Sequence, residues 1–198
     1  MLMNELSIWW ENTPFRRRHL DRITRKHYFE YFNDLRSKTV LEIGCGSGWG
    51  AKIIYKYFSP KKIIATDLDP KQLALAKKNV QIKEIVFEKA DATKLKYKDK
   101  SFDAVFDYGI IHHIPSPEWK NCLNEIYRVL KPEGKVFFDD LSIESFNTIS
   151  GKIGRLLTIH PYSKMYKRDE FINYLNLIGF KIIQKVGGPM YFTIVAKK

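Results

Sequence analysis

An apolar run that is typical of a buried strand breaks into a glycine-rich turn at Val40-Leu41-Glu42-Ile43-Gly44-Cys45-Gly46-Ser47-Gly48-Trp49-Gly50. Gly44, Gly46 and Gly48 allow the backbone to turn sharply and to approach a ligand without a Cβ in the way. The residues from Trp49 to Phe58 predict a helix, whose first N–H groups point into that turn. The stretch therefore predicts a ligand site between a strand and a helix.

The composition is that of a globular protein, with 198 residues of which 44% are hydrophobic and 28% charged. This length suits a single domain over residues 1–198 that needs neither disulfide nor metal. Cys45 and Cys122, the two cysteines, fit a reducing compartment, and we expect no metal site. The first residues lack a secretory signal pattern, and no run approaches the roughly 18 apolar residues of a membrane span. We expect a cytoplasmic location.

Basic residues gather in the N-terminal cap, which we place at residues 1–37. Thr13 and Pro14 predict the start of a helix that continues to about Arg36. The net charge of +12 permits a phosphate or anionic-membrane partner, although it is equally explained by a composition bias of the source. The basic residues of this helix form either a solvated face or a flank that binds an anionic substrate or nucleic acid. They are Arg16, Arg17, Arg18, Arg22, Arg25 and Lys26.

Strand and helix patterns alternate through a core that we place at residues 38–141. Expected strands are 39–43, 61–66, 84–88, 101–106 and 135–141, with helices at 49–58, from Pro70, and from Pro117 to about Leu130, and a turn at 131–134. Such alternation predicts a parallel sheet covered on both faces. The expected fold class is α/β, a Rossmann-like, doubly wound, mostly parallel seven-stranded sheet with an antiparallel C-terminal edge strand.

The last third of the chain has a different pattern. Residues 142–166 have weak periodicity and are interpreted as a connecting segment that covers the site as a lid. Residues 167–198 predict a helix ending at Gly179 and two strands, 180–186 and 191–196, around a tight turn.

Acidic residues follow three of the expected strands. Ligands bind at the carboxyl ends of parallel strands, so Asp67, Asp91 and Asp107 are expected to converge on the glycine turn. The turn lacks the Gly-x-Gly-x-x-Gly pattern of a dinucleotide site, because Trp49 stands at the final glycine position. An acid after the second strand accepts hydrogen bonds from ribose hydroxyls, and one after the third suits an adenine amine. The expected ligand is an adenosine without an essential pyrophosphate.

Several motifs in this order resemble those of class I S-adenosylmethionine-dependent methyltransferases, and most closely the ubiquinone/menaquinone-biosynthesis-like branch. They are Leu41-Glu42-Ile43-Gly44-Cys45-Gly46-Ser47-Gly48, Asp67-Leu68-Asp69-Pro70, Ala90-Asp91-Ala92, Ser101-Phe102-Asp103-Ala104-Val105-Phe106, His112-His113-Ile114 and Arg128-Val129-Leu130-Lys131-Pro132-Glu133-Gly134. The resemblance covers residues 38–141, and Glu133 departs from it where the family has a second glycine.

The resemblance implies a set of residues around S-adenosylmethionine. Glu42 and the glycine turn (Gly44, Cys45, Gly46 and Gly48) belong to the methionine end, with Cys45 a small packing residue rather than a nucleophile. Asp67 belongs to the ribose, Leu68 to one adenine face, and Asp91 with Ala92 to the adenine edge. Asp107 and Tyr108 are expected near the methionine amine and the methyl group.

Methyl transfer from a sulfonium is an in-line displacement that requires alignment and exclusion of water more than a base. His112, His113 and Tyr108 are the candidate catalytic residues, the histidines because their pKa suits a general base. Trp9, Trp10, His160 and Tyr162 are the candidate contacts to the methyl acceptor.

Three functions follow from these patterns. The first is methylation of a small molecule, with the acceptor pocket formed by the N-terminal cap and the lid. The second is methylation of RNA or protein through the basic N-terminal helix, although the sequence after the fourth strand lacks the Asn/Asp-Pro-Pro-Tyr/Phe motif of nucleobase-amine enzymes. The third is a non-catalytic partner protein that only binds S-adenosylmethionine. The oligomeric state is not specified by these patterns.

Overall fold

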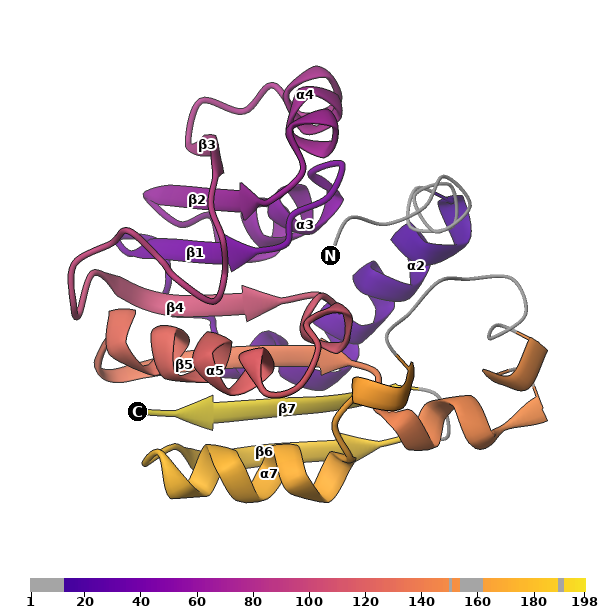
Figure 1. The fold of residues 1–198 in the computed structure, drawn as a ribbon. Helices are drawn as coiled ribbons and strands as arrows, with labels where there is room; N and C mark the ends of the chain where they lie inside the picture. Colours follow the sequence, from indigo (N-terminus) through magenta and orange to yellow (C-terminus); the bar gives the residue numbers. More distant parts are fainter. Residues whose placement is uncertain (1–12, 150, 154–161, 189–190) are drawn as a thin grey trace.

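In the computed structural model, the described residues are 13–149, 151–153, 162–188 and 191–198, and their strands form a seven-stranded sheet (Figure 1). The strands are β1 (Thr39–Ile43), β2 (Lys62–Asp67), β3 (Ile85–Lys89), β4 (Phe102–Asp107), β5 (Leu130–Asp140), β6 (Lys181–Gly187) and β7 (Phe192–Lys197). Their order across the sheet is β3-β2-β1-β4-β5-β7-β6. The predicted fold class is confirmed.

The sheet is parallel except at β7, which runs antiparallel to both β5 and β6. The antiparallel strand therefore lies one place in from the edge, and β6 forms the edge itself. This order follows from the tight connection between β6 and β7, which reverses the chain, and from the pairing of β7 with the free side of β5.

Helices cover both faces of the sheet (Figure 1). They are α2 (Pro14–Ile23), α3 (Trp49–Phe58), α4 (Pro70–Asn79), α5 (Glu118–Val129) and α7 (Arg168–Leu177). Alternate strand residues supply two cores, because successive side chains of a strand point to opposite faces. Val40 packs with α2, α3 and α4 on one face, whereas Leu41 packs with α5 and α7 on the other.

The N-terminal helix is shorter than the periodicity predicts. Helix α2 ends at Ile23, and a π-helical turn at Thr24–Tyr28 and a 3₁₀ turn at Phe29–Tyr31 follow it. The Thr24 hydroxyl donates to the carbonyl of Leu20 at 2.7 Å, which favours a local distortion of the helix. The wider turn changes the helical phase, so that Tyr28 and Phe32 are both buried in the core.

The predicted turn at 131–134 lies within β5 instead. The pairing of β4 with β5 shifts there, from Phe102 opposite Leu130 to Ala104 opposite Lys135. Glu133, the residue that departs from the family pattern, has a φ of 66°. The irregularity lies at the amino-terminal end of β4. The glycine turn lies at the carboxyl ends of the strands, so the two are far apart in the sheet.

The segment 142–166 is described at both of its ends. Ile143–Asn147 and Tyr162–Lys164 are 3₁₀ helices, and Leu141, Phe146 and Met165 form a small core between them. The backbone N–H of Ile143 donates to the carbonyl of Tyr166 at 3.1 Å, which joins the two ends. Its role as a lid stays a prediction. Among the described helices, none is long and apolar enough to cross a membrane.

Candidate active site

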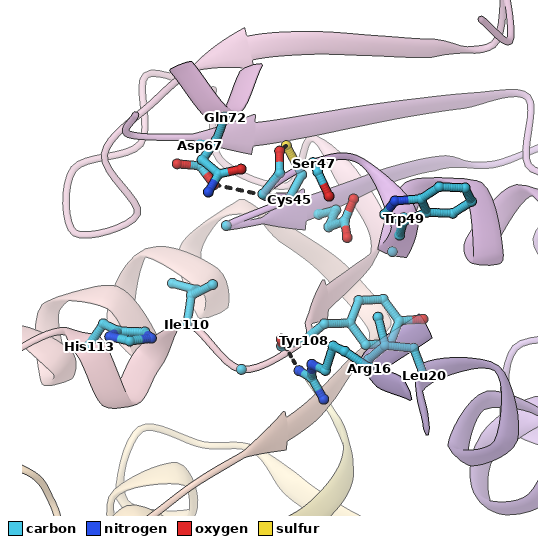
Figure 2. A pocket seen from close by; sticks show the side chains of 15 residues that line it. Arg16, Leu20, Cys45, Ser47, Trp49, Asp67, Gln72, Tyr108, Ile110 and His113 are labelled. Carbon is cyan, nitrogen blue, oxygen red and sulfur yellow. Dashed lines mark hydrogen bonds between the residues drawn. The ribbon is translucent and has the colours of Figure 1, made fainter. Parts of the chain in front are cut away.

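A crevice opens at the carboxyl ends of β1, β2 and β4, where the strand order reverses direction between β1 and β4. Ligands of doubly wound sheets bind at such switch points. The crevice is narrow: its interior volume is about 70 Å³, and about 570 Å³ of empty space is present when the open mouth is included. Its lining comprises Arg16, Leu20, Glu42, Gly44, Cys45, Gly46, Ser47, Trp49, Gly50, Asp67, Gln72, Tyr108, Gly109, Ile110 and His113 (Figure 2).

The glycine turn forms one wall of the crevice, as predicted. Gly44 has a φ of 62°, and a Cβ added to it would lie 1.9 Å from Cγ2 of Ile110, so the position requires glycine. Cys45 is buried, and burial raises the pKa of its thiol well above its ordinary value. A protonated thiol is a poor nucleophile, which agrees with a packing role for Cys45.

Asp67, at the end of β2, fastens the turn to the sheet. Its Oδ2 accepts a hydrogen bond from the backbone N–H of Gly46 at 2.9 Å (Figure 2). Its Oδ1 accepts one from the backbone N–H of Asp69, also at 2.9 Å. Burial raises the pKa of Asp67, and these two backbone donors oppose the shift. A carboxylate oxygen has more than one acceptor position, so Asp67 keeps acceptor capacity for a ligand in the crevice.

Glu42, at the end of β1, is a buried acid on the floor of the crevice. Burial, followed by repulsion from Asp67, raises the pKa of Glu42 to about 8. No donor in the described part of the chain bonds to its Oε2. Its other carboxylate oxygen would lie 1.9 Å from a Cβ at Gly50, which explains the glycine in the first turn of α3. Glu42 therefore has a fixed position, and one of its carboxylate oxygens accepts no hydrogen bond from the described residues.

Replacing Glu42 with glutamine is expected to raise the free energy of unfolding of the cofactor-free protein above pH 8 by a few kcal/mol. The unfolded carboxyl titrates near 4.5 and the folded one near 8, so the folded state binds the extra proton and wild-type stability falls as pH rises between these values. One unit of pKa shift corresponds to about 1.4 kcal/mol. Urea denaturation at a series of pH values measures the difference. A gain that does not grow with pH, or an equal gain from Glu118→Gln at an exposed site, would contradict this assignment.

Gln72, in the first turns of α4, is a candidate functional residue that the sequence interpretation omitted. It is buried beside Asp67 (Figure 2), and neither its amide nitrogen nor its amide oxygen has a hydrogen-bond partner among the described residues. A buried amide without hydrogen-bond partners costs stability. A ligand that hydrogen-bonds to the Gln72 amide removes that cost, which favours its binding. The signal was available, since a polar residue stands beside Leu73 on the inner face of a predicted amphipathic helix.

Tyr108 and His113 line the opposite side of the crevice (Figure 2). The Tyr108 hydroxyl accepts a hydrogen bond from that of Tyr28 at 2.9 Å, and the Tyr28 hydroxyl also bonds to Thr24. Burial raises the pKa of Tyr108 above its ordinary value, so its phenol stays protonated and does not act as a base. His113 is the predicted histidine that reaches the crevice.

Arg16 does not lie on a solvent-facing basic flank, and its assignment to that flank was wrong. Its side chain is 4% exposed and enters the crevice from α2. The guanidinium donates to the carbonyl of Tyr108 at 2.7 Å and to the buried carboxylate of Asp139 at 3.5 Å. The phase of α2 explains the difference, because Arg16 shares its inner face with Leu20 and Ile23.

Asp107 and His112 lie beneath the crevice and not in its lining. Asp107 accepts a hydrogen bond from the N–H of Ile110 at 2.9 Å, and burial together with the charge of Asp140 raises the pKa of Asp107 well above its ordinary value. Nδ1 and the backbone N–H of His112 both contact the carboxylate of Asp140. This buried pairing gives His112 a packing role, so its predicted role as a base has no geometric support.

The predicted adenine contacts lie outside the lining of the crevice. Leu68 is 41% exposed, and Asp91 accepts hydrogen bonds from the N–H and hydroxyl of Thr93 at 2.9 and 2.7 Å. Asp91 and Ala92 nevertheless follow Ala90, whose N–H donates to the carbonyl of Asp67 at 3.1 Å. They are thus adjacent to the acidic end of the crevice, and their roles stay predictions.

The predicted acceptor contacts are mostly outside the described residues. Trp9, Trp10 and His160 fall in that category. Tyr162 is described, and its ring packs against Phe146 with centroids 4.9 Å apart. It belongs to the small core of the 142–166 segment and not to the lining of the crevice.

Residues 41–138 match the family model described as "Methyltransferase domain". A phthiotriol/phenolphthiotriol dimycocerosates methyltransferase of Mycobacterium leprae is 32% identical over 108 residues, which cover 54% of this chain and 39% of that protein. A fatty-acid O-methyltransferase of Mycolicibacterium smegmatis is 34% identical over 107 residues, covering 54% of this chain and 38% of that protein. The matched part of the chain thus spans about two fifths of the length of these relatives.

Solved structures resemble the chain over almost its whole length. A SAM-dependent methyltransferase from Aquifex aeolicus superposes with a TM-score of 0.73 at 22% identity, covering 98% of each chain. An S-adenosylmethionine-dependent methyltransferase from Mesorhizobium loti superposes with a TM-score of 0.72 at 17% identity, covering 90% of this chain and 100% of the other. At these identities the likeness concerns the fold. Residues 41–138 therefore match a methyltransferase domain, and the chain shares its fold with these S-adenosylmethionine-dependent methyltransferases of known structure.

Proposed function

We propose that this chain is an S-adenosylmethionine-dependent methyltransferase that methylates a small apolar molecule. The observation that carries the proposal is the convergence of Asp67, the glycine turn and the unsatisfied Glu42 on one crevice at the topological switch point. The family match over residues 41–138 supports the same reaction class.

The crevice residues fit the polar groups of S-adenosylmethionine. The free oxygen of Glu42 suits the amino group at the methionine end, beside Gly44 and Gly46. Asp67 accepts from the ribose hydroxyls, and the unpartnered amide of Gln72 adds a donor and an acceptor next to it. Leu68, Asp91 and Ala92 extend the site towards the adenine. When bound, S-adenosylmethionine supplies a methyl group made electrophilic by its sulfonium.

The remaining lining residues orient the acceptor and exclude water. Leu20, Ile110 and the ring of Tyr108 give the far wall an apolar surface, and the hydrogen bond from Tyr28 fixes the Tyr108 ring. Displacement at a methyl carbon depends on alignment, which these buried side chains provide. His113 is the titratable group in reach if the acceptor must lose a proton, whereas Tyr108 positions and does not deprotonate.

The named relatives support an apolar, small-molecule acceptor. Those proteins are described as a fatty-acid O-methyltransferase and a phthiotriol/phenolphthiotriol dimycocerosates methyltransferase. The resemblance of the sequence motifs to the ubiquinone/menaquinone-biosynthesis-like branch implies the same class of acceptor. The surface of the crevice that faces away from Asp67 has the matching apolar character.

The proposal is tested by incubating the protein with S-adenosylmethionine carrying a labelled methyl group and a cell extract, then separating lipid, nucleic acid and protein fractions. Label is expected in the organic-solvent fraction, and calorimetry is expected to detect binding of S-adenosylhomocysteine. Label in RNA or protein would replace the small-molecule acceptor by the second hypothesis. Binding of S-adenosylhomocysteine without label in any fraction would favour the non-catalytic alternative, and absence of both would refute the proposed function.

A further inference from the structure

An exposed stripe of aromatic and basic side chains follows the outer face of α2 and the π-helical turn. Phe15 and Phe29 are 68% and 42% exposed and stand at its two ends. The exposed cations between them are Arg18, Arg22, Arg25 and Lys26. Residues three or four positions apart share one face of an α-helix, so Phe15, Arg18 and Arg22 form a row along α2. Arg25, Lys26 and Phe29 continue the exposed surface over the π-helical and 3₁₀ turns. We call this surface, with its residues from Phe15 to Phe29, the α2 stripe.

A basic groove adjoins the α2 stripe between α2 and α3, with about 1180 Å³ of empty space including its open mouth. Its cationic lining residues are Arg17, Arg18, Arg22, Arg25, Lys52 and Lys56. Asp21 is the carboxylate in this lining, and it is neutralised by Lys56 at 2.6 Å. The groove therefore has a large excess of positive charge beside an exposed apolar side chain, and it suits a surface that carries many anions.

The indole ring of Trp49 in the groove and the neighbouring ring of Phe29 are already packed against other side chains, which leaves them poorly placed to stack with nucleic-acid bases. The ring of Trp49 is already covered by the Arg17 guanidinium, which lies 3.8 Å from the ring centroid, and by Lys52 at 4.8 Å. Phe29 stacks on Phe58 with centroids 5.9 Å apart. Single-stranded nucleic acid is bound through aromatic faces that are free to stack with bases, whereas a lipid surface needs cations and one apolar anchor.

The α2 stripe and the crevice lie on opposite sides of helix α2. Arg16 and Leu20, on its inner side, line the crevice, and Trp49 lines both the crevice and the groove. A surface held against the α2 stripe therefore lies one helix away from the acceptor wall. This arrangement suits an acceptor that is dissolved in the same surface.

We propose that the α2 stripe and the basic groove dock the protein onto a membrane surface rich in anionic lipids. The cations bind lipid phosphates, Phe15 enters the region between headgroups and acyl chains, and the crevice lies on the other side of α2, one helix away from apolar acceptor dissolved in that surface. The acceptor part rests on the proposed function. Docking itself needs neither cofactor nor turnover, so vesicle binding tests it separately.

The test is co-sedimentation of the protein with vesicles of phosphatidylglycerol and phosphatidylcholine, compared with vesicles of phosphatidylcholine alone. The variant Arg18→Gln/Arg22→Gln is compared with Lys77→Gln/Lys78→Gln, which removes the same charge from exposed positions on α4. Each basic residue near an anionic surface contributes about 1 kcal/mol, so the stripe variant is expected to bind the anionic vesicles roughly thirtyfold more weakly. The α4 variant is expected to bind within about threefold of wild type. Circular dichroism verifies that both variants are folded.

A second arm tests the apolar anchor. Phe15→Ser is expected to bind weakly at high salt, where the charge contribution is screened and wild type keeps residual affinity. Equal binding to both vesicle types, or equal losses in the two charge variants, would overturn the proposal. Binding of bulk RNA that is lost in the stripe variant, with no vesicle binding, would assign the surface to nucleic acid instead.

Discussion

Asp67→Ala is expected to weaken the binding of S-adenosylmethionine by more than a hundredfold. In the proposed binding mode the substitution removes two hydrogen bonds from ribose hydroxyls to a charged acceptor, each contributing about 1.5–3 kcal/mol, and every 1.4 kcal/mol corresponds to about tenfold in affinity. It also removes the acceptor for the Gly46 N–H, at 2.9 Å, which fixes the glycine turn. Isothermal calorimetry with S-adenosylmethionine and S-adenosylhomocysteine measures the loss.

Asp69→Ala is the matched control for this prediction. Asp69 is another aspartate at the end of β2, but its carboxylate caps α4 by accepting from the N–H of Lys71 at 2.8 Å. Loss of an N-cap typically costs about 1 kcal/mol of stability, without removing a group that lines the crevice. The control is therefore expected to bind within a few-fold of wild type. If Asp67→Ala bound as tightly as the control, the ribose assignment would be wrong.

Arg16→Met is expected to lower the free energy of unfolding by about 3–5 kcal/mol. It removes the guanidinium that bonds to Asp139, a carboxylate with 0% exposure, and breaking a buried ion pair on one side is strongly destabilising. Nε2 of His19, 3.6 Å from the same carboxylate oxygen, then remains as its basic neighbour. For a chain of this size the thermal midpoint is expected to fall by roughly 10 °C. Thermal and urea unfolding followed by circular dichroism measure both quantities.

Two further variants separate this buried pair from a general effect of charge. Arg18→Met removes an exposed arginine from the same helix and is expected to change stability by less than about 0.5 kcal/mol. Arg16→Met/Asp139→Asn removes both charges and is expected to recover part of the loss, because the neutral amide no longer needs a cation. Equal stability of Arg16→Met and Arg18→Met would show that the pair contributes little.

The sheet and the crevice could be predicted because they depend on local patterns and on one topological rule. Alternating strands and helices predict the parallel order, and that order brings Gly44, Asp67 and Tyr108 to the same edge. The antiparallel strand was predicted from the tight connection between two terminal strands, but its place within the sheet depends on long-range pairing with β5. No local pattern contains that information.

Side-chain direction was the part that sequence patterns predicted poorly. Asp107 and Tyr108 are consecutive, and successive strand residues face opposite sides, so only Tyr108 reaches the crevice. Strict use of the alternation of Val105 and Phe106, which belong to opposite cores, would have separated them. Arg16 is different, because its spacing from Leu20 and Ile23 places it on the apolar face of α2. Its charge, and not its position, made a solvent-facing side chain the expectation.

The position of β7 between β5 and β6 has a consequence for the order in which the protein can be assembled on the ribosome. Synthesis delivers β6 before β7, yet β6 pairs with no other described strand. The outer edge of β5 and the edge of β6 that pairs with β7 therefore remain open until the residues up to Lys197 have left the exit tunnel. Open edges are templates for intermolecular pairing, so the nascent chain is most prone to aggregation in the interval just before β7 inserts.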